Sequence, residues 1–503
     1  MLTALISVTD KSKLADFAKK LADLGYEIIS TGGTYKELKA AGVKSLKKVE
    51  EITGFPEIMD GRVKTLHPKI FGGILADRSK TDHLEQAKAN QIPLIDLVVC
   101  NLYNFRQKPG AENIDIGGVS LLRAAAKNHK HVLVICDPDD YEEALIKLND
   151  LKFRKKMAQK AFNQTAAYDT MIADYLIGQE SLHLDFEKVY DLRYGENPHQ
   201  QARLFRERGT DKALGIIGAE VLHGKQLSYN NILDADAAVN LIMEFDEPAA
   251  AVLKHTNPCG VATDENISQA FARAYAADSL SAFGGIIILN RQCNKEIAEE
   301  INKIFAEIVM APDFEAEALK ILKQKKNIRL LKMQGTRNPS TSLGTGKEQG
   351  IKDYRKIIGG ILEQDYDNSR LEEKDLKFVT QLKPSPEEIQ DLLFAWAVAK
   401  HVKSNAVVFV KDKVTVGIGA GQMSRVDAVE LAVKKAGGVE NLQGAVVASD
   451  GFFPFRDSID KLADFEIKSI IQPGGSIRDK EVIEAADKLG ISMGFTAIRA
   501  FKH

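Results

Sequence analysis

The first 150 residues alternate short apolar runs with segments in which apolar residues recur at helical spacing. The run LTALISV at 2–8 predicts a buried strand. The segment from about 10 to 24 predicts a helix whose apolar face is formed by Leu14, Phe17, Ala18 and Leu21. Asp10 is expected to cap this helix and Gly25 to end it.

The same alternation continues to about residue 150. YEIIS at 26–30, LIDLVVCNLY at 94–103 and HVLVICDP at 131–138 predict strands. GGVSLLRAAAKNH at 117–129 predicts a helix between glycine turns. Alternating strands and helices favour a parallel sheet with helices on both faces. Because ligands of such sheets bind at the carboxyl ends of the strands, we expect a site there.

Residues 151–190 are helical and charged, and we expect them to bridge two domains. From about Tyr190 a second, larger α/β region is predicted. Its strand-like runs are AAAVLKH at 249–255, FGGIIILN at 283–290, NAVVFVK at 405–411, TVGIGAG at 415–421, GAVVASD at 444–450 and SIIQPG at 469–474. The predicted organisation is therefore a domain at 1–150, a helical bridge at 151–190 and a domain at 191–503.

A polar segment rich in Gly, Ser and Thr, KMQGTRNPSTSLGTGKEQG at 332–350, interrupts the second region and predicts a surface loop. Its GTGK resembles the end of a phosphate-binding P-loop. However, Glu348 follows Lys347 where that motif requires Ser or Thr, and no apolar strand precedes. We assign the segment 334–350 no role.

Composition mainly excludes functions. The chain has 44% hydrophobic and 27% charged residues, as soluble globular proteins do. Its formal net charge of −2 gives no overall basic field for nucleic acid. The four cysteines include no C-x-x-C pair, which argues against a disulfide framework or a thiolate zinc knuckle. The N-terminus does not resemble a signal peptide, and no apolar run has the length of a membrane span, so we expect a cytoplasmic protein.

Two segments of the first domain predict anion binding. STGGT at 30–34 follows a strand and opens a helix, so its backbone N–H groups and hydroxyls suit a phosphate. A plain glycine turn is the alternative. GRVKTLHP at 61–68 has two cations and a hydroxyl close together, which suits a phosphate or an oxyanion. A solvated basic loop would have the same composition.

The segment NIDIGGVSLLRAAAKNHK at 113–130 places Asp115 before two glycines that begin a helix. Arg123 and Lys127 are four residues apart and share one helix face. This pattern predicts either the border of a pocket for an anion or cations that extend into water.

AVLKHTNPCG at 251–260 ends an apolar run with Lys254 and His255. Its Pro-Cys pair matches part of the zinc deaminase signature, but Ala262 stands where the second Cys is required. One thiolate is too few ligands for a catalytic zinc. A neutral His is a workable general base near pH 7, and an adjacent Lys can stabilise negative charge. The segment therefore predicts a metal-free acid/base pair at a strand end, and an ordinary strand end is the alternative.

Three further segments of the second region predict ligand contacts. DLRYGENPHQ at 191–200 is too polar for a core and is either a binding segment or a polar turn. SAFGG at 281–285 lets Phe283 stack on a planar ring, or is simply a strand start. SDGFFPFRDS at 449–458 suits a flat, partly apolar ligand, or anchors a loop.

In this order, the segments resemble the bifunctional purine-biosynthesis enzymes that combine AICAR transformylase and IMP cyclohydrolase. The resemblance extends over nearly the whole chain and rests on STGGT, GRVKTLHP, CNLY, IDIGGVSLLRAAAKNH, LRYGENPHQ, KHTNPCG, KSNAVVF, GIGAGQMSR and IIQPGGSIRD. It implies an α/β protein with a methylglyoxal-synthase-like parallel-sheet domain that closes formyl-AICAR to IMP. It further implies a cytidine-deaminase-like α/β region, with two related subdomains, that transfers the formyl group of 10-formyltetrahydrofolate to AICAR. A homodimer without catalytic metal is also implied.

The resemblance implies roles residue by residue. In formyl transfer, His255 would be the general base, Lys254 would stabilise or protonate the leaving folate, and Asn405 would orient the amine and the formyl oxygen. Positions that match nucleotide contacts are Arg193, Tyr194, Gly284, Glu307, Arg425 and Arg499; those that match folate contacts are Phe452, Pro454 and Asp457. The set that matches ring closure is Lys64, Tyr103, Asp115 and Lys127, with nucleotide and phosphate contacts at Ser7, Lys11, Ser30, Gly32, Gly33, Thr34, Arg62 and Thr65.

Two other classes of function are considered. Methylglyoxal-synthase-like folds can serve as effector domains, so a non-catalytic nucleotide-sensing protein is the main alternative. Such a protein would need phosphate seats but neither the Lys254–His255 pair nor Asn405. A zinc deaminase is the third possibility, which metal analysis would identify. The two reactive sets favour an enzyme.

Overall fold

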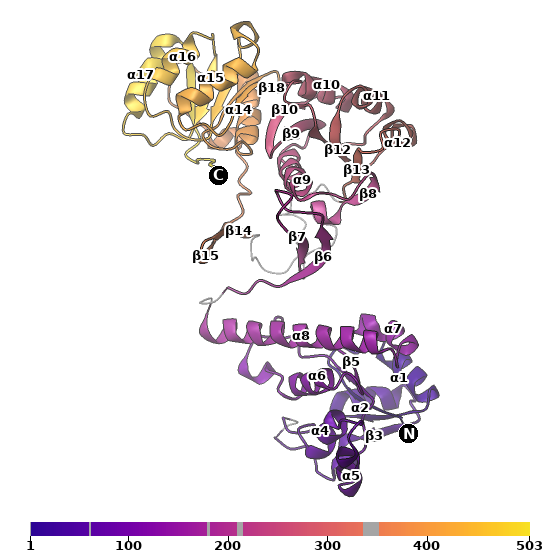
Figure 1. Ribbon diagram of the computed structural model, residues 1–503. Coiled ribbons are helices and arrows are strands. Elements are labelled where there is room, and N and C mark those ends of the chain that lie inside the picture. The colour runs from indigo at the N-terminus through magenta and orange to yellow at the C-terminus, as the bar shows by residue number, and fades with distance from the viewer. Residues whose placement is uncertain (1, 60–61, 179–181, 209–214, 335–351) are drawn as a thin grey trace. The chain divides into compact units, whose positions relative to one another are not determined.

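The computed structural model describes residues 2–59, 62–178, 182–208, 215–334 and 352–503. The chain forms two compact units, Met1–Asp185 and Phe186–His503, each described by itself below (Figure 1). The polar segment predicted to be a loop lies, apart from its first residues, outside the described residues. No helix in the described ranges combines the length and hydropathy that a membrane span requires.

The first unit contains the predicted parallel sheet. Its strands, in the order β3-β2-β1-β4-β5, are all parallel. Their bounds are β1 Leu2–Ser7, β2 Tyr26–Ser30, β3 Leu46–Lys48, β4 Leu97–Cys100 and β5 Leu133–Ile135. β1 lies between β2 and β4, so the strand order reverses there. In such a sheet the loops that follow the two strands at the reversal diverge and leave a crevice for ligands.

Helices cover this sheet and connect its strands. They are α1 Leu14–Asp23, α2 Gly32–Ala40, α3 Val49–Thr53, α4 Pro68–Leu75, α5 Thr81–Ala89, α6 Gly117–Lys127, α7 Tyr141–Ile146 and α8 Leu151–Ile177. The prediction that Asp10 caps α1 is wrong. Its carboxylate accepts hydrogen bonds from the N–H (2.9 Å) and hydroxyl (2.6 Å) of Ser12, and α1 begins only at Leu14. An Asp that bonds two residues ahead favours a turn over a helix start.

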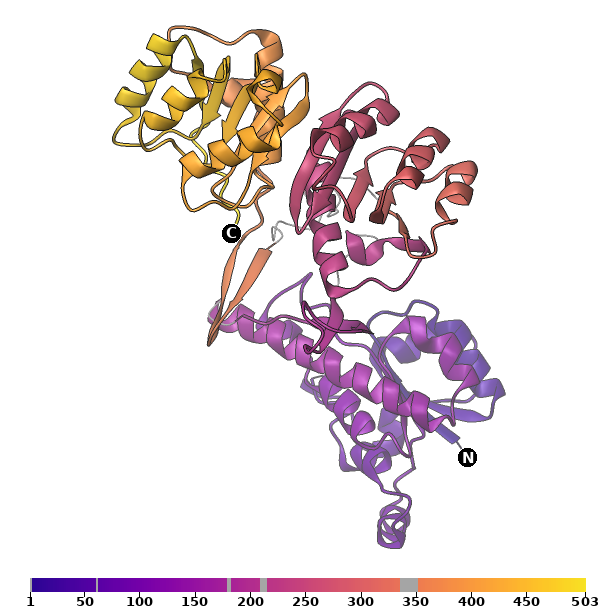
Figure 2. The same ribbon diagram turned by 45° about the horizontal axis from the view of Figure 1, so that its top comes forward.

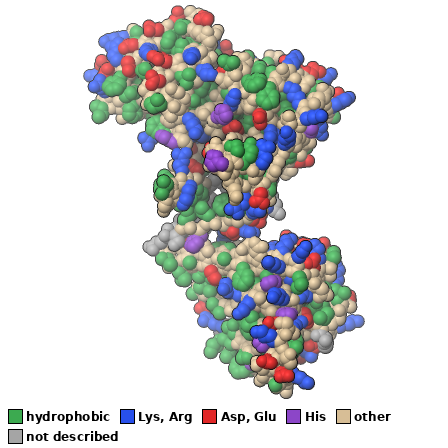
Figure 3. Space-filling model, viewed as in Figure 1, with side chains coloured by type: hydrophobic (Ala, Val, Ile, Leu, Met, Phe, Trp, Pro, Cys, Tyr) green, Lys and Arg blue, Asp and Glu red, His purple; other side chains and the backbone are tan. Residues whose placement is uncertain are grey.

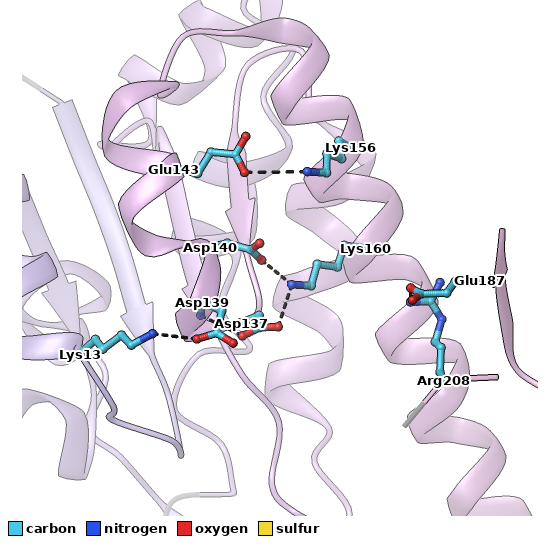
Figure 4. A network of polar contacts seen from close by, with 9 residues as sticks. All are labelled: Lys13, Asp137, Asp139, Asp140, Glu143, Lys156, Lys160, Glu187 and Arg208. Atoms are coloured by element: carbon cyan, nitrogen blue, oxygen red, sulfur yellow. Dashed lines mark hydrogen bonds and ion pairs between the residues drawn. The ribbon is translucent and has the colours of Figure 1, made fainter. Parts of the chain in front are cut away.

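α8, which we expected to bridge two domains, packs within the first unit (Figures 1 and 2). Its apolar face includes the buried Phe153, Met157 and Ala161. From the same helix, Lys160 Nζ lies 2.7 Å from carboxylate oxygens of both Asp137 and Asp140, just beyond β5 (Figure 4). α8 is thus part of the first unit's core, and the functional domain boundaries stay a prediction.

The second unit is built around one mixed sheet, in the order β16-β21-β20-β19-β17-β18-β10-β9-β11-β12-β13-β8. Its two halves have the same succession of elements. The first half runs α9 Tyr229–Ile242, β9 Ala249–Lys254, β10 Asn257–Thr263, α10 Ile267–Ala277, β11 Gly285–Leu289, α11 Lys295–Lys303, β12 Ala306–Ala311, α12 Ala316–Leu322 and β13 Arg329–Lys332. The second runs α14 Pro386–Ala399, β17 Val407–Lys411, β18 Val414–Gly419, α15 Arg425–Lys435, β19 Val446–Ser449, α16 Asp457–Ala463, β20 Ser469–Gln472, α17 Asp479–Leu489 and β21 Ser492–Phe495.

The halves meet where β10 pairs with β18, at Ala262 and Val414. In each half a helix packs directly on a strand. A side-chain carbon on Gly260 of β10 would lie 1.9 Å from a backbone oxygen of α10, and one on Gly417 of β18 would lie 2.3 Å from a backbone oxygen of α15. Only glycine allows this approach. The parallel sheet of the first unit and the mixed α/β sheet of the second unit confirm the predicted α/β fold class.

The remaining strands are β8 Glu220–His223 and β16 Lys377–Phe378 at the sheet edges, and two hairpins, β6 Phe186–Leu192 with β7 Ala202–Glu207 and β14 Lys352–Ile357 with β15 Gly360–Asp365. The β14–β15 hairpin stands out from the body of the second unit (Figures 1 and 2). On the face drawn in Figure 3, basic and acidic side chains are interspersed, as the small net charge leads one to expect.

Candidate active sites in the two units

In the first unit, two lysine side chains converge on the start of α2. Gly32 begins the helix with φ 44°, directly after β2 and Thr31. A side-chain carbon on Gly32 would lie 3.8 Å from Lys64 Nζ, and one on Gly33 would lie 3.7 Å from Lys11 Nζ. The helix N-terminus adds partial positive charge and free N–H groups. This arrangement favours an anion seat over a plain glycine turn.

The hydroxyl groups around this seat divide into two kinds. The Ser30 hydroxyl donates to the Ile6 carbonyl (2.7 Å), and the Thr34 hydroxyl bonds both the N–H and the carbonyl of Val8. The Ser30 bond joins the end of β2 to β1, and the Thr34 bonds join the start of α2 to the residue that follows β1. Ser7 and Thr31, whose hydroxyl oxygens lie 3.3 Å apart, are free of such backbone bonds among the described contacts. We therefore expect Ser7 and Thr31 to contact a ligand, and Ser30 and Thr34 to shape the seat.

Asn101 holds the loop that carries Lys11. Its side-chain oxygen accepts the N–H groups of Thr9 (2.6 Å) and Asp10 (2.9 Å), and its amide donates to the Asp10 carbonyl (2.9 Å). Asn101 follows β4, which neighbours β1 in the sheet. Asn101 belongs to the CNLY motif, and the sequence by itself indicates no role for it.

Asp115 lies just before α6, and both its carboxylate and its backbone N–H are hydrogen-bonded. Its carboxylate accepts N–H groups from Gly118 (2.7 Å) and Tyr103, and its own N–H donates to the Tyr168 hydroxyl (2.8 Å). Burial raises the pKa of the Asp115 carboxyl, whereas the two N–H donors and the Lys64 charge act to lower it. Tyr168, which belongs to α8, was not found from the sequence because nothing near it in the chain indicates this contact.

The other residues predicted for ring closure lie at different places. Lys64 Nζ is 3.7 Å from Glu57, Thr65 is buried against the start of α6, and the exposed Arg62 pairs with Glu112. Lys127 ends α6, ten residues after its first residue, about 15 Å along the helix axis. The described contacts therefore join Lys64, Asp115 and the Tyr103 backbone, and do not join Lys127 to them.

His67 and Arg123, which belong to the predicted anion-binding segments, make contacts that stabilise the fold. The Nδ1 atom of His67 accepts the Lys69 N–H (3.1 Å), so His67 caps α4. The Arg123 guanidinium lies 5.6 Å from the centre of the Phe162 ring and packs against α8. Arg123 therefore has a partner in α8 that does not require a bound anion.

In the second unit, Lys254 and His255 lie at the sheet edge where β9 ends. Lys254 pairs with Asn257, so His255 and Thr256 form a two-residue hairpin turn, with φ 50° and 63°. Positive φ at both positions is typical of a type I′ turn. Lys254 Nζ donates to the Phe283 carbonyl (2.8 Å), and the His255 side chain is exposed. Both predicted reactive groups are therefore accessible at one edge.

The starts of β11 and β12 lie at this same edge, because β11 is antiparallel to β9 and parallel to β12. Gly284, with φ 72°, donates its N–H to the Phe305 carbonyl (2.8 Å), and the Phe283 and Phe305 rings are 5.1 Å apart. Glu307 Oε2 accepts from Arg329 (3.1 Å) and Asn231 (3.3 Å). Two predicted nucleotide contacts, Gly284 and Glu307, thus lie near Lys254.

The second half of the sheet brings Asn405 to the same edge, where β17 begins and β18 ends. The Lys403 N–H donates to Asn257 Oδ1 (3.0 Å) and ties the Asn405 segment to the hairpin that carries His255. Both hydrogens of the Asn405 amide are engaged, by the carbonyls of Gln422 (2.8 Å) and Met423 (3.2 Å). Asn405 Oδ1 accepts from Arg425 (2.9 Å) and keeps one lone pair.

Arg425 is buried behind Asn405. Its guanidinium also donates to the Ser449 hydroxyl (2.8 Å) and to the carboxylate of Asp450, which is fully buried. With only 8% of the residue exposed, Arg425 is placed to hold Asn405. Its predicted nucleotide contact stays a prediction.

A cavity of about 250 Å³ lies across the junction of the two halves. It is lined by Lys254, His255, Asn257, Pro258, Cys259, Ala277, Asp278, Ser281, Gly417, Ile418, Ala420, Leu431 and Lys435. Burial raises the pKa of Cys259 to about 12, so its thiol is neutral near pH 7. In the described ranges no group of three or more His, Cys, Asp or Glu side chains could hold a metal ion.

The remaining predicted ligand contacts belong to exposed segments. Arg193 lies over the Tyr194 ring (4.7 Å) and bonds its hydroxyl (2.9 Å). Arg499 lies over the Phe501 ring (4.8 Å). In SDGFFPFRDS, Phe453 is buried and anchors the segment, whereas Phe452 is exposed. Pro454 and Asp457, at the start of α16, complete this segment. One phenylalanine therefore anchors the loop, while the other is exposed and could contact a flat, partly apolar ligand.

Comparison with known proteins decides the family. A model described as AICARFT/IMPCHase bienzyme matches residues 125–435, and one described as MGS-like domain matches residues 13–134. The chain belongs to the AICARFT/IMPCHase bienzyme family. It is therefore an enzyme with two activities, a formyltransferase acting on AICAR and an IMP cyclohydrolase, which perform the last two steps of IMP synthesis.

Similar proteins extend over the full chain. "Bifunctional purine biosynthesis protein PurH" of Acetivibrio thermocellus is 50% identical over 99% of both chains, and the protein of the same name from Thermoanaerobacter sp. (strain X514) is also 50% identical over 99% of both. That of Bacillus subtilis (strain 168) is 48% identical over 99% of both. These matches confirm the resemblance stated from the sequence motifs.

Proposed function

We propose that the first unit closes the ring and the second unit transfers the formyl group. What supports this division is the presence of two separate reactive sets, each at one edge of its own sheet. Lys64 and Asp115 lie beside an anion seat in the first unit. Lys254 and His255 lie in the second unit at the same edge as Asn405. We further propose, from the family resemblance, 10-formyltetrahydrofolate as co-substrate and a cytoplasmic homodimer without catalytic metal.

In formyl transfer, the 5-amino nitrogen of AICAR attacks the formyl carbon of the folate. His255 removes one proton from the amine as the new C–N bond forms, and the formyl oxygen becomes an oxyanion. Lys254 has two donors beyond its bond to Phe283 and can stabilise that charge. The bond to folate N10 then breaks, and N10 takes a proton from the Lys254 ammonium or the His255 imidazolium. Formyl-AICAR and tetrahydrofolate are the products.

The contacts of Asn405 refine its predicted role. Because both of its N–H hydrogens are engaged by backbone carbonyls, Asn405 cannot donate to the formyl oxygen without breaking one of these bonds. Its Oδ1 retains a lone pair beside Arg425 and can accept an N–H of the attacking amine. We therefore propose that Asn405 orients the amine, and that Lys254 stabilises the oxyanion.

In ring closure, the carboxamide nitrogen of formyl-AICAR attacks the formyl carbon. The amide nitrogen loses one proton, for which Asp115 is the proposed acceptor, and the formyl oxygen gains one, for which Lys64 is the proposed donor. The C–O bond of the resulting carbinolamine then breaks. The hydroxyl leaves as water with the proton that Asp115 had taken, and the formamido nitrogen gives its proton to the neutral Lys64 amine. Both side chains thereby return to their starting protonation states. Burial raises the pKa of the Asp115 carboxyl, which makes its carboxylate a stronger base than an exposed one.

One pair of variants tests the division of labour. His255→Ala is expected to abolish formation of formyl-AICAR while it leaves cyclisation of supplied formyl-AICAR intact. Lys64→Ala is expected to do the reverse. Each variant is the control for the other, with both reactions followed by absorbance and product mass. Equal loss of both activities in either variant would refute the division between the units.

A further inference from the structure

The turn that carries His255 is held by a carboxylate from another element. Asp234, on α9, accepts the N–H groups of both His255 and Thr256, the latter at 2.7 Å. Two-residue turns of this type favour Asn and Gly, because both positions need positive φ. Thr256, a β-branched residue with φ 63°, is unfavourable there. The Asp234 carboxylate supplies an acceptor for both N–H groups of this strained turn.

The second half of the sheet contains the same device. Asp391, on α14, accepts the N–H groups of Asp412 (2.8 Å) and Lys413 (2.7 Å), which form the β17–β18 turn with φ 54° and 56°. Asp391 follows Asp234 by 157 positions (391 − 234), and Asp412 follows His255 by the same interval (412 − 255). In the second half, however, no predicted site residue lies on the turn.

The two devices lie at opposite edges of the sheet. β10 and β18 are antiparallel, and the N–H of Thr263, at the end of β10, donates to the Lys413 carbonyl (3.1 Å). The Asp412–Lys413 turn therefore lies at the end of β10 that is far from His255, about 20 Å away for a strand of this length. Asp391 and its turn are therefore a matched control for Asp234 and the turn that carries His255.

We propose that Asp234 is a positioning residue for formyl transfer: it holds the His255–Thr256 turn in its left-handed conformation and so fixes the direction of the His255 imidazole. The proposal rests on the proposed role of His255 as general base. α9 contributes a second contact to the same edge, because Asn231 donates to the predicted nucleotide contact Glu307. Through Asn231 and Asp234, one helix connects the nucleotide site to the base.

The test compares Asp234→Ala with Asp391→Ala. Asp234→Ala is expected to lower kcat of formyl transfer about 100-fold, the order of loss that a displacement of about 1 Å causes. Because the hydrogen bonds of Asp234 go to the backbone of the turn, KM for AICAR is expected to stay within about threefold. Asp391→Ala, which removes the same bonds from the other turn, is expected to leave both within about threefold.

Rescue separates positioning from a general weakening of the fold. Thr256→Gly added to Asp234→Ala supplies a residue that adopts positive φ without strain. The double variant is expected to have a kcat about tenfold higher than that of Asp234→Ala alone. Asp234→Asn, which retains one acceptor, is the variant to use if Asp234→Ala does not fold. No loss with either Asp234 variant, an equal loss with Asp391→Ala, or no rescue by Thr256→Gly would overturn the proposal.

The role of His255 as base is tested separately from the positioning role of Asp234. Transfer at the wild-type rate by His255→Ala would refute the role of His255 as base, whatever the Asp234 variants do. An inactive His255→Ala together with fully active Asp234 variants would leave that role intact and refute only the positioning role. The two failures are therefore distinguishable.

Discussion

Replacement of Arg425 by Met is expected to destabilise the second unit and to stop formyl transfer. The guanidinium is buried, pairs with the fully buried Asp450 and holds Asn405 Oδ1 at 2.9 Å. Removal of one partner leaves the Asp450 charge buried without compensation, which costs about 3–5 kcal/mol. Met fills much of the volume, so the loss reports the charge and the hydrogen bonds rather than a cavity.

The assay is thermal unfolding followed together with both activities. For a unit of several hundred residues, about 2 °C of Tm corresponds to 1 kcal/mol, so we expect the transition of the second unit to fall by roughly 6–10 °C. Formyl transfer should fall because Asn405 loses its partner, while ring closure, which we propose for the first unit, should persist.

A double variant separates the ion pair from simple packing. Arg425→Met combined with Asp450→Asn removes the uncompensated charge. The double variant should lose less unfolding free energy than the two single variants together, by roughly 1–3 kcal/mol. Strictly additive losses, or a single variant whose Tm is unchanged, would refute the reasoning that the pair is strongly coupled.

Three further predictions concern groups outside the reacting sets. Burial lowers the pKa of His401, whose Nε2 lies 2.9 Å from Glu244 while Nδ1 has no hydrogen-bond partner among the described residues. The folded state then binds fewer protons than the unfolded state below about pH 6.5, so stability present above that pH is lost as pH falls, by up to about 1.4 kcal/mol per pH unit. His401→Gln should weaken this dependence in denaturant titrations between about pH 7.5 and 5.5, and an unchanged dependence would contradict it. Gly419→Ala should destabilise the second unit by roughly 1–3 kcal/mol, since the added carbon would lie 1.8 Å from the Ala428 backbone oxygen; an unaltered Tm would show that the strand and helix can separate. The Cys259 thiol, with its pKa raised to about 12 by burial, should be alkylated near pH 8 far more slowly than in the unfolded chain, as mass spectrometry can measure, and equal rates would count against its burial.

Much of the architecture could be predicted from local patterns. The strands of the first unit are short apolar runs bounded by turns, and the predicted strands at β9, β11 and β17 to β20 are all present. The start of α1 could not be predicted, because the Asp10 carboxylate has an equally good acceptor role in a turn with Ser12. The place of α8 could not be predicted either, since a charged helix with one apolar stripe reads alike as a bridge and as a cover for a core.

For the candidate sites, the sequence indicated residues next to a strand end or a glycine turn, such as Lys254, His255 and Asp115. It did not indicate residues that act from another element. Asp234, Tyr168 and Asn101 each bond backbone groups 20 or more positions away, and nothing in their own neighbourhood differs from an ordinary helix or strand end.

The sequence by itself determined the type and order of the elements, the family, and the chemical identity of the reactive groups. Periodicity and turn residues are local properties, and the motifs are ordered along the chain. Only the tertiary structure decided which hydroxyls are free to meet a ligand, which hydrogens of Asn405 are already engaged, and which carboxylate holds the His255 turn. These depend on the pairing of strands distant in sequence, because a hydrogen-bonding group is committed by whatever partner the fold places within about 3 Å of it.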